Sequence, residues 1–405
     1  MVVVGAGPAG AAAALALARC GQRVHLVEAR PHAPRRWRGE ALMPSGLAAL
    51  DQLGLLPLAA DVPQRALRSW AMLLDGQLLF DAPEPLGSPQ PCTLVEQTAL
   101  LTTLRQAAQH GVMAEQGTCQ WHAGQAVSQL LEHQGRICGV ELADGHRIPA
   151  DLVIGCDGRD SRLRQWTQLP LEREPSPLQL GWFDLDLPAL APLHSWLAGR
   201  FVTVLAQEGS FALFGSATDR LQLGWLHPPG RPPAPPPGGW PELWARCLPA
   251  SAAAPLRALA GATIPEPVPL AVRVGLAPQW HRPGLLLLGD AVHPMSPLRA
   301  QGISMALRDA VVAANLLAPA LASGNANQID AALPTVAAAR LEEIRTVQRL
   351  QRLEAARGEL LRQRPLLRRW LGLNRSWAGP LAQRHWIHQQ RQLRDGVLPL
   401  PQGPP

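Results

Sequence analysis

The first thirty residues alternate apolar runs with a glycine-rich turn, and this order predicts a strand, a helix and a second strand. Residues 2–4 are a short apolar run, residues 5–10 read GAGPAG, and residues 11–19 are almost entirely Ala and Leu. Residues 22–28 then form a second apolar run with the alternation of a strand. The pattern predicts a βαβ unit with parallel strands.

Further along the chain, the apolar pattern predicts elements of several kinds. Residues 38–56 predict a helix ending at Gly54, and residues 94–112 a strand followed by a helix. Short strands with turns at 134–135 and 144–145 predict an antiparallel unit, followed by a buried strand at 151–155. Residues 171–270 read as strands with Pro-rich breaks, residues 285–288 are four leucines before Gly289, and residues 334–394 read as helices that contain many arginines.

The glycines of the first turn each have a physical role. Gly5 permits the bend, Gly7 lets the backbone approach a pyrophosphate, and Gly10 lets the helix pack closely on the strand. The helix N-terminus then faces the phosphates. Glu28 ends the second strand, where its carboxylate can accept hydrogen bonds from ribose hydroxyls and would repel a 2′-phosphate. The unit predicts a site for FAD or NAD rather than NADP, and the alternative is an ordinary glycine-rich turn.

Composition narrows the class of protein. The 405 residues are 47% hydrophobic, which is enough for a large core and two or three lobes. The net charge of +6 comes from residues 340–394, where 13 Arg and 4 Glu give +9, so the remainder sums to −3. This uneven distribution argues against nucleic acid as a partner. Six scattered cysteines without a CxxC pair indicate a reduced, cytosolic protein without a metal site. No apolar run was expected to reach the ~18 residues of a membrane span.

Three separated motifs resemble those of the class A flavoprotein monooxygenases, the family of para-hydroxybenzoate hydroxylase and the ubiquinone-pathway hydroxylases. They are residues 5–10, the sequence CDGRDSRLR at 156–164 and the sequence GDAVHP at 289–294. Their order and spacing match over residues 1–320. The resemblance implies an α/β fold with a Rossmann-type FAD-binding domain made of 1–70, 92–170 and 271–330. It also implies a substrate β-sheet domain made of 71–91 and 171–270, and a helical C-terminal region, 331–405, with a frayed end.

The resemblance also implies roles for individual residues. Asp290 would hydrogen-bond the ribityl chain of FAD, and Asp157 and Gly158 would serve both FAD and the visiting nicotinamide. Pro297 and residues 301–304 would wrap the isoalloxazine ring, with a helix from Ser304 onward directed at the ring. Gln97 is either a further cofactor contact or a simple helix cap. The full set of expected FAD contacts is Gly5, Gly7, Pro8, Ala9, Gly10, Glu28, Arg38, Gln97, Asp157, Gly158, Gly289, Asp290, Pro297, Gly302, Ile303 and Ser304.

The sequence departs from the family at several points. Ala300 stands where the family has glycine, which would strain the ring-facing loop if that position needs a positive φ. The chain has no tyrosine and no lysine. A tyrosine relay cannot activate the substrate, so any base must be His or an acid, with His227 as a candidate or else a histidine without a catalytic role. The missing lysine and Trp-x-Trp-x-Ile-Pro signature argue against halogenation. His293 is expected to order its loop.

Aromatic residues between positions 171 and 270 predict a hydrophobic or aromatic substrate. Trp182, Phe211, Phe214 and Trp225 alternate with small or polar residues and are candidates for the wall of a pocket, with core packing as the alternative for each one. The arginine-rich tail is expected to form a helical lobe on the flavin domain, and the alternative is an interfacial helix resting on anionic lipid.

The resemblance implies a reaction in which NADH or NADPH reduces FAD, oxygen adds to form a flavin hydroperoxide, and a hydroxyl group passes to the substrate. Two alternatives remain at this point. One is an FAD-dependent reductase of carbon–carbon double bonds, of the geranylgeranyl reductase type. The other is a flavin-holding interaction protein without turnover, for which Ala300 is the only support in the sequence. The oligomeric state is left open.

Overall fold

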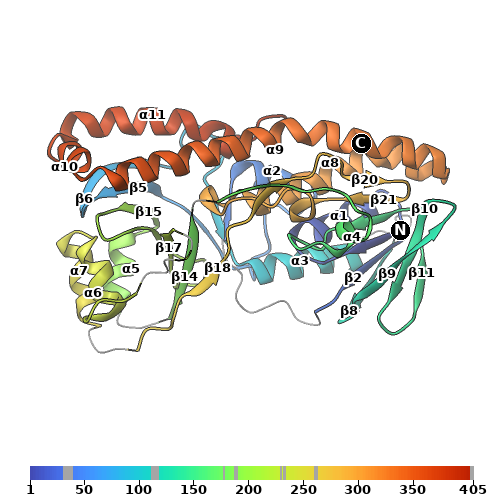
Figure 1. The fold of residues 1–405 in the computed structure, drawn as a ribbon, viewed down its shortest axis with the longest axis horizontal. Coiled ribbons are helices and arrows are strands. Elements are labelled where there is room, and N and C mark those ends of the chain that lie inside the picture. The colour runs from blue at the N-terminus through green and yellow to red at the C-terminus, as the bar shows by residue number, and fades with distance from the viewer. Residues whose placement is uncertain are drawn as a thin grey trace.

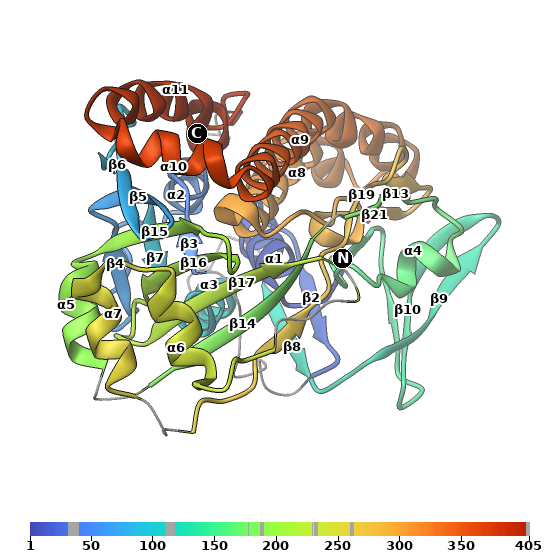
Figure 2. The ribbon, with the colours of Figure 1, turned by 60° about the vertical axis from the view of Figure 1, so that its left-hand side comes forward.

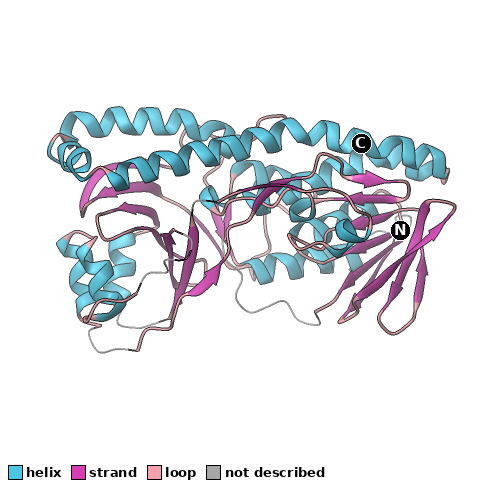
Figure 3. Ribbon diagram, viewed as in Figure 1, coloured by secondary structure: helices cyan, strands magenta, loops and turns pink. Residues whose placement is uncertain are grey.

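The structure is a computed structural model that describes residues 1–30, 40–110, 118–176, 178–186, 190–228, 230, 234–259 and 263–401. Figure 1 shows two groups of strands with long helices lying along one side of both. Colouring by secondary structure shows that the helices bridge the two groups (Figure 3). The site therefore has to be sought where the two groups of strands and the helices meet.

The first sheet has six strands in the order β20-β21-β12-β1-β2-β8. All but β20 run parallel. The apolar strand β1 lies in the interior of the sheet, and all of its residues are buried, as is usual for a strand covered on both faces. The strands are β1 (Val2–Val4), β2 (Val24–Glu28), β8 (Cys119–Ala123), β12 (Val153–Gly155), β20 (His281–Arg282) and β21 (Leu285–Leu287). The βαβ unit of the sequence is thus β1, α1 (Pro8–Arg19) and β2.

Helices and smaller sheets surround this first sheet. α1 packs against α3 (Gln97–His110) and against the core helix α8 (Gln301–Ser323), while α2 (Pro44–Gln52) packs on α8. The antiparallel unit is β9 (Val127–His133), β10 (Arg136–Leu142) and β11 (Arg147–Pro149). Two further small sheets join β3 (Ala41–Leu42), β7 (Thr93–Val95) and β4 (Gln64–Ala66), and pair β13 (Glu172–Glu174) with β19 (Val274–Leu276).

The second sheet has seven strands in the order β18-β14-β17-β16-β15-β5-β6. Its strands are β5 (Ser69–Leu74), β6 (Gln77–Pro83), β14 (Gln179–Leu185), β15 (Arg200–Leu205), β16 (Ser210–Gly215), β17 (Leu221–His227) and β18 (Val268–Leu270). One face packs into a core with α5 (Ala191–Leu197), α6 (Gly239–Arg246) and α7 (Ala250–Arg257). The other face looks toward the first sheet and the C-terminal helices.

The C-terminal region consists of three helices, α9 (Ala326–Gln363), α10 (Pro365–Leu373) and α11 (Arg375–Asp395). α9 packs on α8 at one end, and α10 and α11 pack on β5 and β6 at the other (Figure 2). Because α9 is 38 residues long, it reaches from one sheet to the other. The C-terminal region is therefore part of the frame that fixes the two sheets relative to each other.

Three expectations from the sequence need correction. The helix expected from Ser304 begins at Gln301, and the helical tail expected from residue 334 begins at Ala326. Pro334 lies inside this tail helix, whose start is capped by the Asn325 side chain accepting from two backbone N–H groups. The segment Leu298–Ser323 is long and apolar enough to cross a membrane, with mean hydropathy 1.4, but 67% of it is buried inside the protein. It is a core helix.

Candidate active site

The first turn forms a tight passage from strand to helix. Gly5 has φ +95°, and a Cβ there would lie 2.4 Å from the Cys156 carbonyl oxygen. A Cβ on Gly10 would lie 1.8 Å from the Gly5 carbonyl oxygen, so only glycine allows α1 to approach the strand this closely. A Cβ on Gly7 would meet no atom within 4 Å. The turn is thus closed on its inner side and open at Gly7.

Glu28 is held against this turn. Its Oε2 accepts from the Ala6 N–H at 2.8 Å and its Oε1 from the Arg30 N–H at 3.0 Å. The carboxylate therefore stands where β2 ends and ties that end of the strand to the glycine-rich turn. This is the position that the sequence predicted for a ribose contact, and the contact itself stays a prediction.

The second motif follows β12 and is linked to the third. Asp157 caps α4 (Arg162–Trp166), since its Oδ2 accepts from the Arg162 N–H at 2.7 Å and the Leu163 N–H at 3.1 Å. Its Oδ1 is buried and has no hydrogen-bond partner in the described part of the chain. Buried Arg164 donates to the Ala291 carbonyl. Two motifs that are more than 120 residues apart are thereby joined directly.

The third motif is a 3-10 turn, Gly289–Ala291, directly after the buried leucines. Gly289 has φ +63°, and a Cβ there would lie 2.9 Å from the Ala9 side chain. Burial raises the pKa of Asp290, and the Arg159 guanidinium, whose Nη2 lies 3.6 Å from Asp290 Oδ2, partly opposes this shift. The buried strand β21 thus places Asp290 in the wall of a cavity.

A buried charge network supports the third motif, and sequence reasoning missed it. Asp309 accepts from the Gly289 N–H at 3.0 Å, from Arg340 Nε at 2.7 Å and contacts His293 Nε2 at 2.5 Å. Although burial alone would raise it, the pKa of Asp309 is held at about 2 by His293 and Arg340. His293 orders this loop, as the sequence suggested. The available signal was a charged pair, residues 308–309, inside an otherwise apolar helix.

Glu343 continues this network toward the C-terminus. It accepts from Arg308 Nε at 3.1 Å, pairs with Arg340, and accepts from the Val397 N–H at 2.9 Å. The side chains of Arg308, Arg340 and Glu343 are at most 3% exposed. The C-terminal segment is thereby connected through buried charges to the turn that carries Asp290.

The loop before α8 is held in an unusual conformation. Arg299 and Ala300 both have positive φ, 59° and 47°. The expected strain at Ala300 is therefore present. Arg299 is clamped: its Nε donates to Glu354 of α9 at 2.6 Å, and its guanidinium lies 5.3 Å from the Trp70 ring centre and 4.9 Å from that of Trp386. Side chains from three distant segments thus fix the loop.

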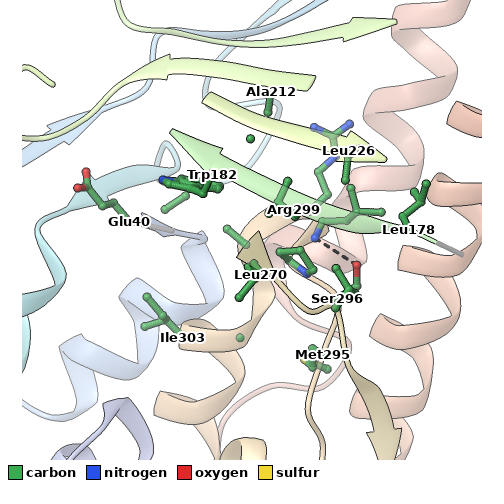
Figure 4. Close-up of a pocket in the computed structure, with 18 of the residues that line it drawn as sticks. Glu40, Leu178, Trp182, Ala212, Leu226, Leu270, Met295, Ser296, Arg299 and Ile303 are labelled. Atoms are coloured by element: carbon green, nitrogen blue, oxygen red, sulfur yellow. Dashed lines mark hydrogen bonds between the residues drawn. The ribbon is translucent and has the colours of Figure 1, made fainter. Parts of the chain in front are cut away.

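One cavity of about 1320 Å³ connects these motifs with the second sheet. Figure 4 shows residues of its wall, with Glu40 and Trp182 on one side and Met295, Ser296 and Ile303 on another. The expected FAD contacts that line it are Gly5, Gly7, Pro8, Ala9, Glu28, Gln97, Asp157, Gly158, Asp290, Pro297, Gly302 and Ile303. Gly10, Gly289 and Ser304 stand behind the wall, and the Ser304 hydroxyl accepts from the Met43 N–H at 3.2 Å. Arg38 lies outside the described residues.

The aromatic candidates divide between the two faces of the second sheet. All four border the cavity, as does His227, whose Nδ1 lies 3.0 Å from the Pro228 carbonyl. The register places Trp182 and Phe214 on the face toward the first sheet, and Phe211 and Trp225 on the opposite face. Phe211 and Trp225 stack at 5.2 Å and belong to the core with α6 and α7. Trp182 and Phe214 are therefore the pair that lies on the same side of the sheet as the three motifs.

Comparison with known proteins identifies the class. Residues 1–341 match the family model described as FAD binding domain, so the chain belongs to this FAD-binding family. It is 34% identical over 373 residues to 6-methylpretetramide 4-monooxygenase of Streptomyces rimosus, covering 87% of this chain and 82% of that protein. Squalene epoxidase 4 of Arabidopsis thaliana is 27% identical, with 79% of this chain and 62% of that protein covered. The chain is therefore an FAD-dependent oxidoreductase of the monooxygenase class.

The fold agrees with solved structures of this class. PqsL of P. aeruginosa, solved in complex with 2-aminobenzoylacetate, superposes with a TM-score of 0.74 at 21% sequence identity. The match covers 92% of this chain and 97% of that one, so it includes both sheets and the C-terminal helices. The expected α/β fold with an FAD-binding domain and a helical C-terminal region is confirmed.

The residues of the cavity fit FAD. Gly7, Gly158 and Gly302 are positions where a Cβ would meet no atom within 4 Å, so backbone is open to a close ligand there. Gln97 Oε1 and Asp157 Oδ1 are buried acceptors without a partner among the described residues, and both side chains line the cavity. Unpaired buried acceptors need donors, and ribose, ribityl and ring N–H groups supply them. These residues would hold FAD along the edge of the first sheet.

Proposed function

We propose that the chain hydroxylates a hydrophobic, aromatic small molecule with O2, using NADH or NADPH as reductant. FAD, when bound, takes electrons from the reduced nicotinamide and activates O2. The proposal rests mainly on the observation that Trp182 and Phe214 line the same cavity as the loop from Pro297 to Gly302. Phe201 stacks on Phe214 at 4.9 Å and extends this aromatic face. The sheet thus offers an apolar platform opposite the ring-facing loop.

The individual contacts follow from the geometry. Gly5, Gly7 and the N-terminus of α1 would bind the pyrophosphate, and Glu28 a ribose. Asp290 and Asp157 would orient the ribityl chain, with backbone of 297–303 around the ring. The 34% identical relative supports a ring hydroxylation, since its name is that of a 4-monooxygenase of 6-methylpretetramide. The name of that relative also argues against the double-bond reductase and the flavin-holding protein without turnover.

An experiment on the purified protein tests this function. The yellow holoenzyme is mixed with NADH or NADPH and a panel of aromatic compounds under ¹⁸O2, and flavin bleaching and product mass are followed. We expect at least one compound to accelerate bleaching and to gain one ¹⁸O atom. A product that gains hydrogen but no oxygen would instead support the reductase alternative, and flavin that no compound and no nicotinamide bleaches would support a flavin-holding protein.

We also propose that this cytosolic enzyme touches an anionic membrane surface through α10 and the start of α11. Leu366, Trp370 and Leu373 form one stripe of α10 and are 81%, 47% and 70% exposed. Trp377 and Leu381 of α11 are 51% and 57% exposed. Exposed arginines that make no ion pair within the described chain flank this stripe, namely Arg364, Arg369 and Arg384. Apolar side chains beside cations suit a lipid interface.

Sedimentation with vesicles tests the membrane contact. We expect the protein to bind vesicles with phosphatidylserine more tightly than vesicles of phosphatidylcholine alone, and Leu366→Gln with Leu373→Gln to remove the difference. Leu78→Gln, on an exposed leucine of β6 outside this stripe, is the matched control. Equal sedimentation of the wild type with both vesicle types would contradict the proposal.

A further inference from the structure

The acidic residues that line the cavity differ in how many ion pairs and hydrogen bonds their carboxylates already make. Most are occupied, either by cations or by two backbone N–H groups: Glu28, Asp157, Asp160, Asp290, Glu354 and Glu359. Glu208 is exposed to solvent. Glu40 is the remaining acid of the described wall: it is half-buried, and its carboxylate has a single hydrogen bond within the described chain. Asp157 Oδ1 is also without a partner among the described residues, but Asp157 lies beside the first sheet, whereas the Glu40 carboxylate contacts the second sheet and is free to take another donor there.

The position of Glu40 is fixed from two sides. Its carbonyl accepts from the Val95 N–H at 2.8 Å, which ties its backbone to β7 next to the first sheet. Its Oε2 accepts from the Ala217 N–H at 2.9 Å, in the turn between β16 and β17 of the second sheet. Oε1 has no hydrogen-bond partner within the described chain. The carboxylate thus stands at the junction of the two sheets, in the same wall as Trp182 (Figure 4).

The surroundings of Glu40 set its protonation. The pKa of Glu40 is raised to about 7, mainly by burial and also by the carboxylates of Glu96, beside β7, and Asp184, on β14; the Ala217 N–H and Arg65 of β4 act in the opposite direction. The nearby cations do not neutralise it, because Arg65 pairs with Asp219 and Arg220 pairs with Asp184. A group with such a pKa can both take and return a proton near neutral pH.

We propose that Glu40 is a catalytic residue that binds a hydroxyl group on the aromatic substrate and removes its proton. This inference rests on the proposed function. In the step, the substrate O–H bond breaks, the proton passes to Glu40 Oε1, and the electron pair remains on the substrate oxygen. The resulting phenolate is richer in electrons at the ring carbons, which favours transfer of an electrophilic oxygen. After the transfer, the C–H bond at the hydroxylated ring carbon breaks and that proton leaves to solvent, while Glu40 returns its own proton to the former phenolate oxygen, so the product ring is aromatic and the carboxylate is restored.

The proposal assigns to an acid the role that a tyrosine cannot have here, because the chain contains none. His227 also lines the cavity, but its Nδ1 is engaged at the Pro228 carbonyl. The substrate class narrows accordingly. We expect phenols to be preferred over their methyl ethers, which have the same ring but no proton to give.

The test uses the holoenzyme and matched probes. 4-Methylphenol with 4-methylanisole, and 2-naphthol with its methyl ether, are compared in binding and in acceleration of flavin bleaching between pH 5.5 and 9. We expect the wild type to prefer each phenol with an inflection near pH 7. Glu40→Gln should lower the preference about 100-fold and abolish the inflection, with flavin content unchanged. Glu40→Asp should keep the inflection at a lower rate, and Glu132→Gln, a remote exposed acid, should behave as wild type.

A measurement without substrate separates the possible failures. Infrared difference spectra of wild type against Glu40→Gln should show one carboxylic acid losing its proton near pH 7. The role of Glu40 is overturned if Glu40→Gln keeps the inflection, or if the wild type prefers neither phenol over its methyl ether. The proposed function can still hold in either case, because other compounds can still be oxygenated. Absence of oxygen transfer to every compound overturns the proposed function, and the role of Glu40 with it, even if the infrared band is present.

Discussion

At the first sheet the cavity wall is mainly backbone, whereas at the second sheet it is mainly side chains. Gly5 and Gly158 have positive φ, which leaves little choice of residue, and Gly7 leaves open space beside them. Trp182 and Phe214 form the second part, on a face where any large apolar residue could pack. A site formed by the backbone therefore restricts which residue types can occupy its positions, whereas a site formed by side chains allows many residue types.

The two parts also depend differently on the C-terminal helices. The turn of Asp290 is supported by the buried network of Asp309, Arg340 and Glu343, which crosses from α8 to α9. The loop before α8 is supported by Glu354 of α9 and by Trp386 of α11. A tail that the sequence suggested as a separate helical lobe thus holds both parts of the cavity in place.

The largest effect is expected from removing the charge at the centre of the buried network. Asp309→Asn should lower the free energy of unfolding by about 3–5 kcal/mol, because Arg340 then loses a buried counter-charge. Asp51→Asn, on an exposed face of α2, is the control and should change it by less than about 0.5 kcal/mol. Urea denaturation of both variants measures this, and equal stability would show that Gly289 is held without the network.

The same carboxylate gives a pH dependence with a definite sign. The folded pKa of Asp309 is about 2, below its ordinary value of 3.8, so its contribution is fully present above pH 4. It is lost as the pH falls from about 4 to about 2, and amounts to about 2 kcal/mol. The wild type should therefore lose more stability over this range than Asp309→Asn does.

A second prediction separates ligand binding from folding at the backbone-built end. Gly7→Ala adds a methyl group that meets no protein atom within 4 Å, at a residue with φ −70°. Unfolding of the apoprotein should not change, but FAD should bind about 100-fold more weakly, or about 2.7 kcal/mol, because the pyrophosphate needs that space. Gly10→Ala should destabilise the apoprotein itself, given a Cβ at 1.8 Å from a carbonyl. Fluorescence titration with FAD measures both variants, and undiminished affinity of Gly7→Ala would place the pyrophosphate elsewhere.

The difference between the backbone-formed and the side-chain-formed parts of the cavity explains which parts could be predicted from the sequence. The glycine-rich turn was predictable because its local geometry demands glycine at Gly5 and Gly10, whereas Asp290 was singled out by the resemblance to a family, and the FAD contacts of Glu28 and Asp290 stay predictions. Asp309 was missed because its partners, Arg340 and the Gly289 N–H, are 31 and 20 residues away along the chain. Buried ion pairs between α8 and α9 leave no local sequence pattern. The one hint is a charged residue within an otherwise apolar helix.

The substrate side was harder to predict for a related reason. Four aromatic residues were singled out, but which face of a strand looks inward depends on the register of β14, β16 and β17. Phe211 and Trp225 fell on the core face. Glu40 was passed over because a lone acid before a short strand carries no motif, and only the fold brings the Ala217 N–H and Asp184 close to it.

A third prediction concerns the clamp between the loop before α8 and the tail. Glu354→Gln removes the negative charge beside Arg299, whose side chain is 8% exposed, and should lower stability by about 1–3 kcal/mol and increase loss of flavin during purification. Glu174→Gln is the control: it breaks the exposed ion pair between Glu174 of β13 and Arg352, which lies on α9 as Glu354 does. It should change stability by less than about 1 kcal/mol. Thermal denaturation and the ratio of flavin to protein absorbance measure both. If the two variants behave alike, the tail does not hold this loop.

The smallest effect is expected at Ala300, where the side-chain clamp and the backbone requirement meet. Its φ of 47° disfavours alanine, so Ala300→Gly relieves strain of about 1 kcal/mol in the folded state. Glycine also gains freedom in the unfolded chain, which offsets a similar amount, so the net change in unfolding free energy should be within about 0.5 kcal/mol. In the Glu354→Gln background, however, the loop relies on its own backbone preference, and the same substitution should then restore part of the lost flavin retention. A double-mutant cycle of these two substitutions measures the coupling between them. Strict additivity would mean that the clamp on Arg299 does not compensate for the alanine.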